Sequence, residues 1–253
     1  LMRASRDVKK SNPYTQLDMT GFLKALPFTL TGAQKAAIRE ILEDFAAGKT
    51  MNRLVQGDVG SGKTMVAAAA AYCAVKNGQQ AALMAPTEIL AEQHYHSLKK
   101  LFEPMGIRMA LLTGSQTAKQ KTQTRQALAE GNVDFAVGTH ALLTESTVFS
   151  HLGLVIADEQ HRFGVAQRAK LAAKGADPHL LVMSATPIPR TLALLMYGDL
   201  EVSIIDELPP GREAVDTFLV GESYRARDLD EVKNGIITAE EYRHKWIGGE
   251  ING

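Results

Sequence analysis

The chain has 253 residues, enough for one large α/β domain or for a medium-sized domain with appendages. Its hydrophobic content of 45% is typical of a globular protein and excludes a disordered chain. The 28 basic and 28 acidic residues cancel, so any contact with nucleic acid must come from a local patch or from backbone amides.

The cysteine content and the apolar runs bear on the compartment. Cys73 is the only cysteine, which excludes an internal disulfide and suits a reducing environment. The longest apolar run, Met65–Val75, is mostly alanine and too short to cross a membrane. The first residues are charged and lack the apolar core of a secretion signal. We therefore expect a cytoplasmic protein.

The predicted elements alternate along the chain. Residues Leu1–Lys24 are polar, and we expect a linker or a remnant of a preceding domain. Strands are expected at Arg53–Gln56, Ala81–Ala85, Met109–Leu112, Asp134–Val137, Leu154–Ala157, Leu180–Met183 and Val202–Ile205. Helices are expected at Lys63–Lys76, Ile89–Phe102, Ala118–Glu130, Val165–Ala173 and Arg190–Tyr197. This alternation predicts a three-layer α/β domain with a mostly parallel central sheet and helices on both faces.

The sequence changes character near its end. Residues 223–253 are charged, contain the only tryptophan, Trp246, and have no apolar run strong enough to continue the sheet. We expect a divergent tail, disordered or foreign to the fold, after a domain that spans residues 25–222.

The most specific motif lies between the first apolar run and an alanine-rich helical run. Its residues are Gly57, Asp58, Val59, Gly60, Ser61, Gly62, Lys63 and Thr64, which fit G-x-x-x-x-G-K-[ST]. The glycines let backbone N–H groups turn around a phosphate, Lys63 adds a positive charge, and Thr64 offers a hydroxyl to Mg²⁺. A glycine-rich segment can be only a turn, but the whole motif in this setting predicts a nucleoside triphosphate site.

A pair of acidic residues follows the apolar run Leu154–Ala157. Asp158 at a strand end can hold Mg²⁺ opposite Thr64, and Glu159 can accept a proton from the attacking water. An Asp-Glu pair is often only a solvated loop. Its place at a strand end, after a phosphate loop, favours the catalytic interpretation.

Weaker signals surround these two motifs. Ser184 and Thr186 follow another apolar run, where they can hydrogen-bond the acidic pair and sense the γ-phosphate; a turn before a helix that starts near Pro189 is the alternative. Phe28 can stack on a base, and Gln34 can pair with an adenine edge, although a helix cap with a core phenylalanine explains both almost as well.

Together these segments resemble a superfamily 2 helicase motor, and in particular the first of its two RecA-like domains. The resemblance runs from about Leu26 to Glu222. Phe28 with Leu30–Gln34 resembles the Q motif, which selects adenine, and the phosphate loop resembles motif I. Segments similar to motifs Ia, II and III are Ala85–His94, Asp158–His161 and Ser184–Thr186.

The finer resemblance is to the bacterial RecG family of branch-migration helicases. Besides the phosphate loop, the segments that carry it are Ala85–His94, Asp158–Gly164, Ala185–Thr191 and Asp206–Arg212. The transcription-repair coupling translocases share much of this pattern and remain an alternative, but Ser61, Gln160 and the last segment favour RecG.

This resemblance implies roles for further residues. ATP and Mg²⁺ would be the cofactors, His161 would join Lys63, Asp158 and Glu159 in catalysis, and Gln160 would join Ser184 and Thr186 in coupling. The DNA backbone would be held by Pro86, Thr87, Glu88, Thr113, Gly114, Gly138, Thr139 and His140. Backbone N–H groups at such strand–helix junctions bind phosphates without any net positive charge.

The expected whole is a monomeric double-stranded DNA translocase that acts on branched DNA in recombination and repair. RecG proteins also have a wedge domain and a second RecA-like domain with an arginine finger, and neither is recognisable in this sequence. We therefore expect weak or no ATP hydrolysis from the chain alone. Two other classes stay open: an inert nucleotide- or DNA-binding module, and a kinase or peptide motor on the same scaffold.

Overall fold

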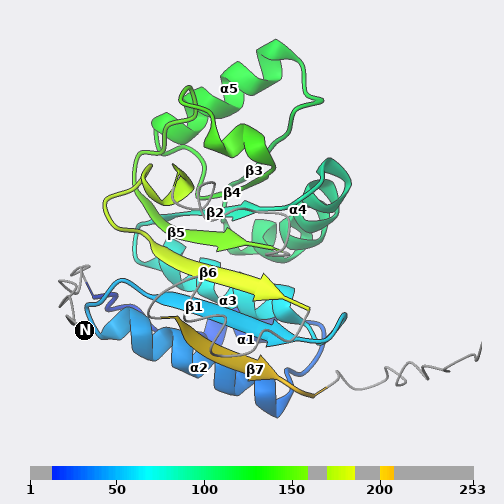
Figure 1. Ribbon diagram of the computed structural model, residues 1–253, viewed down its shortest axis with the longest axis vertical. Helices are drawn as coiled ribbons and strands as arrows, with labels where there is room; N and C mark the ends of the chain where they lie inside the picture. Colours follow the sequence, from blue (N-terminus) through cyan, green and yellow to red (C-terminus); the bar gives the residue numbers. More distant parts are fainter. Residues whose placement is uncertain (1–12, 159–169, 186–199, 208–253) are drawn as a thin grey trace, which may run out of the picture. The chain divides into compact units, whose positions relative to one another are not determined.

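The computed structural model describes residues 13–158, 170–185 and 200–207. Within these residues seven strands form one sheet in the order β3-β4-β2-β5-β6-β1-β7, and every neighbouring pair is parallel (Figure 1). The strands are β1 (Asn52–Gly57), β2 (Gln80–Met84), β3 (Met109–Leu112), β4 (Phe135–Gly138), β5 (Leu152–Ala157), β6 (His179–Ser184) and β7 (Glu201–Ile205). The predicted α/β fold is confirmed, with a sheet that is wholly parallel in the described residues.

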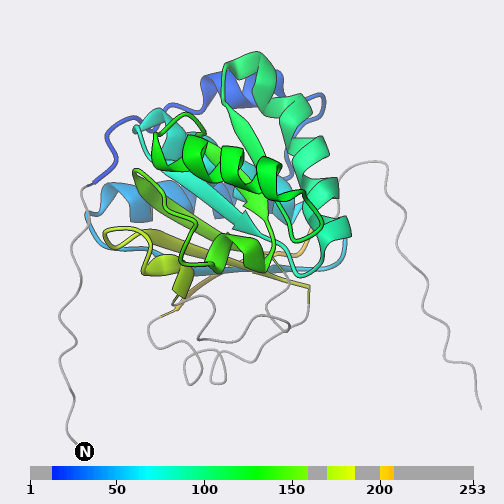
Figure 2. The same cartoon turned by 90° about the horizontal axis from the view of Figure 1, so that it is seen from above.

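Helices cover both faces of this sheet (Figures 1 and 2). They are α1 (Thr20–Ala25), α2 (Gly32–Ala46), α3 (Lys63–Lys76), α4 (Glu88–Phe102) and α5 (Ala118–Ala129), with short 3₁₀ turns η1 (Glu103–Met105) and η2 (His140–Leu143). Because strand side chains alternate between faces, neighbouring residues of β2 enter different cores. Leu83 packs in the core that contains residues of α1 to α4, whereas Ala82 packs in the core that contains Leu128 of α5.

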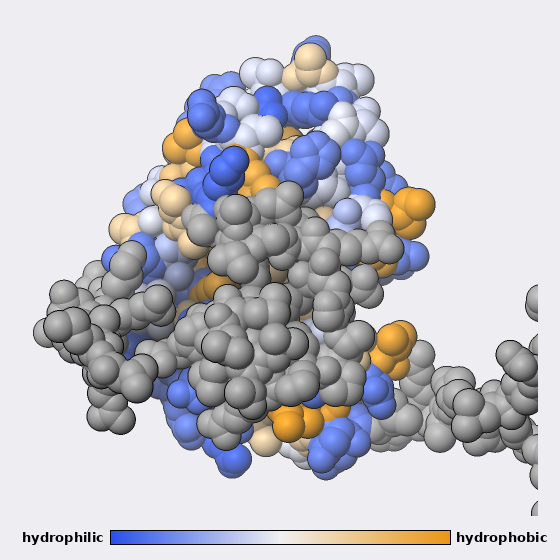
Figure 3. Space-filling model, viewed as in Figure 1, coloured by the Kyte–Doolittle hydropathy of each residue, from blue (hydrophilic) through white to orange (hydrophobic). Residues whose placement is uncertain are grey.

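The outer helices differ in how much they bury. Helix α3 is apolar nearly all round, with an unbroken buried stretch from Val66 to Ala74, as befits a helix packed under the sheet. Helix α5 buries only Leu128, and the surface over it is mainly hydrophilic (Figure 3). No helix in the described part of the chain is long and apolar enough to cross a bilayer.

All seven expected strands are present, and their ends differ from the expected ones by two residues or fewer. The helices expected at Lys63–Lys76, Ile89–Phe102 and Ala118–Glu130 correspond to α3, α4 and α5. Of the helix expected at Val165–Ala173, only residues 170–172 are described as helical, and Arg190–Tyr197 lies outside the described residues, as do residues 1–12 and 208–253.

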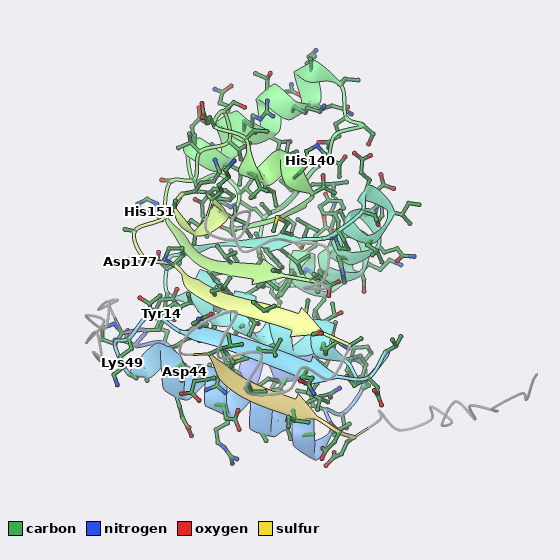
Figure 4. All side chains as sticks on the ribbon, in the orientation of Figure 1. Tyr14, Asp44, Lys49, His140, His151 and Asp177 are labelled. Carbon is green, nitrogen blue, oxygen red and sulfur yellow. The ribbon has the colours of Figure 1, made fainter. Side chains whose placement is uncertain are left out.

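Residues 13–25 are packed against the domain, although the sequence was interpreted as a linker up to Lys24. The Tyr14 hydroxyl donates a hydrogen bond to the Gly153 carbonyl at 3.3 Å, and its ring centroid lies 4.8 Å from that of Phe45. Phe22 of α1 is fully buried beside Tyr72. Asn77 also binds the Thr15 and Gln16 amides, so aromatic packing and backbone hydrogen bonds together hold a segment whose average composition is polar. Tyr14 lies at the amino ends of the strands, near His151 and Asp177 (Figure 4).

Candidate ATP site and adjoining sheet edge

The predicted phosphate loop lies between β1 and α3, as its motif requires. Gly60 and Gly62 adopt left-handed conformations, with φ of 82° and 87°. The φ of Gly62 would strain any other residue, and a Cβ there would displace Nε2 of Gln34 from its bond to the Ser61 carbonyl. The loop leads directly into the first turn of α3, so the free N–H groups and the positive end of the helix dipole face the loop.

Lys63 lies against the backbone of its own loop. Its ammonium donates hydrogen bonds to the carbonyl oxygens of Gly57 at 2.6 Å and Asp58 at 2.8 Å. An ammonium group has three donors, so these carbonyls can be exchanged for phosphate oxygens when a nucleotide enters. Ser61 is buried, whereas Val59 is 74% exposed at the tip of the loop.

Gln34 holds the loop to α2. Its side-chain carbonyl accepts a hydrogen bond from the backbone N–H of Thr31 at 2.9 Å, and the Thr31 hydroxyl accepts one from the backbone N–H of Gln34. The two bonds form a capping box at the start of α2. The side-chain nitrogen of Gln34, Nε2, donates a hydrogen bond to the backbone carbonyl of Ser61 at 2.8 Å. Gln34 is therefore buried and engaged with protein at both ends, whereas Phe28 is 48% exposed and its stacking on a base stays a prediction.

The order of the strands brings the expected nucleotide residues together. Strands β5, β6 and β1 are neighbours in the sheet, and their carboxyl ends carry Asp158, Ser184 and the phosphate loop, respectively. Thr64 is the second residue of α3, so a hydroxyl and a carboxylate flank this edge. These hard oxygen donors fit Mg²⁺, which is held by one or two protein groups together with substrate phosphates.

Several expected residues near this site lie outside the described residues. They are Glu159, Gln160, His161 and Thr186. Ser184 is described; it ends β6, is 1% exposed and pairs in register with Gln56 of β1. Its buried place between the two motifs agrees with a coupling role, which stays a prediction.

Sequence reasoning missed one residue of this site, His94. Its Nε2 atom lies 2.6 Å from Oδ2 of Asp158, and both side chains are largely buried, with 13% and 14% exposed. A signal was present in the sequence, because Ala91, His94, Leu98 and Phe102 have the spacing of one helix face. A polar residue within an apolar stripe points to a buried polar partner.

The other half of the edge carries the residues expected to hold DNA. Strands β3, β4 and β2 end next to one another, followed by Thr113–Gly114, Gly138–His140 and Pro86–Glu88. Thr87 caps α4 by accepting a hydrogen bond from the Leu90 amide at 3.3 Å. The strand ends thus converge as predicted, while the contacts with DNA stay a prediction.

The carboxylate of Glu88 occupies part of this second half. Oε1 of Glu88 accepts a hydrogen bond from the Ser115 amide at 3.1 Å. The Ser115 side chain, followed by the backbone amides of Ser115 and Gly114 and the charge of His140, lowers the pKa of the Glu88 carboxyl. These are groups that would suit a phosphate, so a DNA phosphate at this position would have to displace the Glu88 carboxylate.

The remaining residues of the expected DNA set differ in exposure. Thr113 and Thr139 are 1% and 3% exposed, so their side chains are buried in the domain and a ligand cannot reach them. Gly138 is required by packing, since a Cβ there would lie 2.2 Å from the Leu112 carbonyl oxygen. His140 is exposed and lies far from the Tyr14 end of the sheet (Figure 4). Ser115 and His140 are exposed and Pro86, Thr87 and Glu88 are partly exposed, so a ligand can reach these side chains.

Comparisons with known proteins agree with this arrangement. The DEAD/DEAH box helicase family matches residues 31–195, which is well over half of the chain. The chain belongs to the DEAD/DEAH box helicase family. Its RecA-like fold is that of the family, and the expected helicase resemblance is confirmed.

Individual relatives are similar over nearly all of the chain. It is 53% identical to the ATP-dependent DNA helicase RecG of Aquifex aeolicus over 242 residues, which cover 93% of this chain and 31% of that protein. With RecG of Escherichia coli K12 the identity is 52% over 220 residues, covering 85% and 32%. The chain therefore spans about a third of the length of these relatives.

Solved structures show the same likeness. The structure of RecG bound to a three-way DNA junction matches with a TM-score of 0.72 and 43% identity, covering 95% of this chain and 31% of that one. The DUF1998 helicase MrfA bound to DNA and AMPPNP matches with a TM-score of 0.60 at 18% identity, over 81% of this chain and 31% of that one, which supports the fold alone.

Proposed function

We propose that this chain is the ATP-binding motor domain of a helicase that translocates on double-stranded DNA and remodels branched DNA, as in fork regression and Holliday-junction branch migration. The observation that carries the proposal is one sheet edge with two halves. Strands β5, β6 and β1 end in the groups expected to bind the nucleotide, and β2, β4 and β3 end in groups suited to a phosphate backbone. The similarity to RecG, including RecG bound to a three-way DNA junction, supports this choice.

In the proposed cycle, the backbone N–H groups of the loop and the Lys63 ammonium bind the nucleotide phosphates. Thr64 and Asp158 hold Mg²⁺, whose charge offsets that of the phosphates. Glu159 and His161 are proposed to position the attacking water, and Gln160, Ser184 and Thr186 to couple the nucleotide state to DNA. The opposite half of the edge holds the DNA backbone once Glu88 leaves the Ser115 amide.

The test is Mg-ATP binding and steady-state hydrolysis by this chain with no DNA, with linear duplex and with forked DNA. We expect nucleotide binding that changes when forked DNA is added, because the two halves share one edge. Binding that no DNA alters would contradict the DNA half and favour a kinase-like enzyme or an inert nucleotide-binding module. A preference for linear duplex over forks would favour a translocase of the transcription-repair coupling type. The cytoplasmic location and the monomeric state stay predictions.

A further inference from the structure

One contact joins the two halves of the sheet edge. Helix α4 follows β2, on the half expected to hold DNA, and Asp158 follows β5, on the nucleotide half. The two strands are neighbours, with Met84 opposite Ala157. Across this border the ring of His94 in α4 contacts the Asp158 carboxylate, with Nε2 and Oδ2 2.6 Å apart.

The chemistry of the pair fixes the direction of this hydrogen bond. An ionised carboxylate can only accept, so the His94 ring donates from Nε2. The carboxylate has about four acceptor positions, and the bond to His94 takes one of them. The His94 bond therefore restrains the rotation of the Asp158 carboxylate.

Stability alone does not account for the pair. His94 lies on the helix stripe of Ala91, Leu98 and Phe102, where an apolar side chain would bury well. Replacing buried polar pairs by packed apolar residues is often neutral or stabilising, so a buried pair is weak evidence for a stabilising role. Orientation of the carboxylate is the property that an apolar residue could not supply.

We propose that His94 is a positioning residue, which orients the Asp158 carboxylate for Mg²⁺ and ties it to helix α4. The proposal rests on the proposed function, since it takes Asp158 as the Mg²⁺ carboxylate and the start of α4 as part of the DNA edge. His94 lies six residues after Glu88, or about 9 Å along the helix axis. Because a helix moves as a rigid element, a shift of its first turn reaches Asp158 through His94.

The first experiment measures how much Mg²⁺ strengthens binding of a fluorescent, non-hydrolysable ATP analogue to the 253-residue chain, as the ratio of affinities in Mg²⁺ and in EDTA. His94→Leu removes the donor and keeps an apolar volume. His94→Gln places an amide N–H at the same distance from the backbone as Nε2. His96→Ala is the matched control, because His96 is an exposed histidine on the same helix.

We expect His94→Leu to reduce the Mg²⁺-dependent gain about tenfold, a loss typical for groups that orient a metal ligand. Its affinity in EDTA should stay that of the unaltered chain, since the phosphate loop is untouched. His94→Gln should restore most of the gain, and His96→Ala should leave it unchanged. An unchanged gain in His94→Leu, or an equal loss in EDTA, would overturn the positioning role.

The second experiment measures the factor by which forked DNA changes affinity for the same analogue in Mg²⁺. We expect this factor to approach one in His94→Leu and to be kept in His94→Gln, with DNA affinity in the absence of nucleotide unchanged in both. The same factor in His94→Leu as in the unaltered chain would overturn the link to α4. A failure of the unaltered chain to bind the analogue would instead refute the proposed function itself.

Discussion

At the scale of single residues, Gln34 shows how a side chain expected to contact the ligand is used by the protein. Both ends of its amide are bonded, to the Thr31 amide and to the Ser61 carbonyl. In this arrangement Gln34 shapes the phosphate loop, and adenine recognition would use the second N–H donor and the second carbonyl lone pair of the same side chain. The two roles predict different effects on different nucleotides.

We predict that Gln34→Ala weakens ATP and GTP binding alike, by about 1 kcal/mol or roughly fivefold, because it removes one hydrogen bond that holds the loop. Competition binding with the two nucleotides in Mg²⁺ measures this. Phe28→Ala is the comparison variant, since its exposed ring is the group expected to stack on the base. A loss confined to ATP in Gln34→Ala would show that Gln34 reads adenine directly.

His179 gives the domain a predicted sensitivity to acid. It is 2% exposed, its Nδ1 accepts a hydrogen bond from the Met51 amide at 2.9 Å, and Nε2 has no hydrogen-bond partner among the described residues. Burial lowers the pKa of the His179 imidazole to about 4, partly offset by the charge of Asp44. The folded chain therefore holds this ring neutral.

The unfolded chain binds this proton first, near pH 6.5, so the stability due to a neutral His179 is complete above that pH and is lost as pH falls toward 4. We predict a loss of about 2 kcal/mol between pH 7 and pH 5 from this group. His179→Asn keeps an acceptor for the Met51 amide and cannot take up the proton. Urea unfolding at both pH values should show a smaller loss in the variant; an equal loss would contradict the prediction.

The sequence revealed those site residues whose signal is local. The phosphate loop is contiguous, and Asp158 directly follows an apolar run, so both could be found without any structure. His94 could not be matched to Asp158, because 64 residues separate them and only the strand order β2-β5 brings them together. The Glu88–Ser115 contact was missed for the same reason, since it depends on how two loops meet.

At the scale of elements, strands were easier to predict than the first helices. Buried parallel strands form continuous apolar runs, which a single sequence displays clearly. Helix α2 was missed although Ala33, Ala37, Ile41 and Phe45 repeat at helical spacing behind the Thr31 cap. The charged residues of α2 lie between these apolar positions, so the segment has no continuous apolar run. One of its polar faces is itself structural, because it binds a buried arginine.

That arginine, Arg53, clamps α2 to the strand that leads into the phosphate loop. It contacts Asp44 at 2.7 Å, Glu40 at 2.8 Å and the Ser203 hydroxyl at 2.9 Å, and so joins α2, β1 and β7. The Arg53 side chain is 8% exposed, while those of Glu40 and Asp44 are 41% and 24% exposed. Water can therefore solvate the two acids when the arginine is removed.

We predict that Arg53→Met lowers the free energy of unfolding by about 2 kcal/mol, the usual value for hydrogen bonds to charged groups. Arg39→Met is the control, because Arg39 is exposed on helix α2, which Arg53 contacts, and its loss should change stability by less than about 0.5 kcal/mol. Urea midpoints at constant slope report both changes. Equal midpoints for the two variants would show that the clamp contributes nothing.

At the scale of the whole molecule, the strand order separates two tasks along one edge. The groups expected to bind the nucleotide follow β5, β6 and β1, and the groups expected to bind DNA follow β2, β4 and β3. This division was predictable only in part, since the sequence places all these groups after strands without telling which strands are neighbours. The parallel sheet turns a linear series of motifs into two adjoining surfaces.

The last prediction concerns turnover by this chain on its own. Many P-loop motors depend on an arginine from another domain or protein, which contributes about 10³–10⁵ in rate. The chain spans about a third of its RecG relatives, so we expect it to bind Mg-ATP and to hydrolyse it slowly. Single-turnover hydrolysis, followed in a preparation shown to be monomeric, measures this directly.

Asp158→Asn sharpens that measurement. Asparagine keeps an acceptor for His94 but lacks the charge that holds Mg²⁺, so the variant should bind nucleotide in EDTA normally and lose the residual hydrolysis. Rapid hydrolysis by the unaltered monomer would mean that this chain supplies its own transition-state cation. Hydrolysis that survives in Asp158→Asn would remove Asp158 from the metal site and, with it, the reason for its contact with His94.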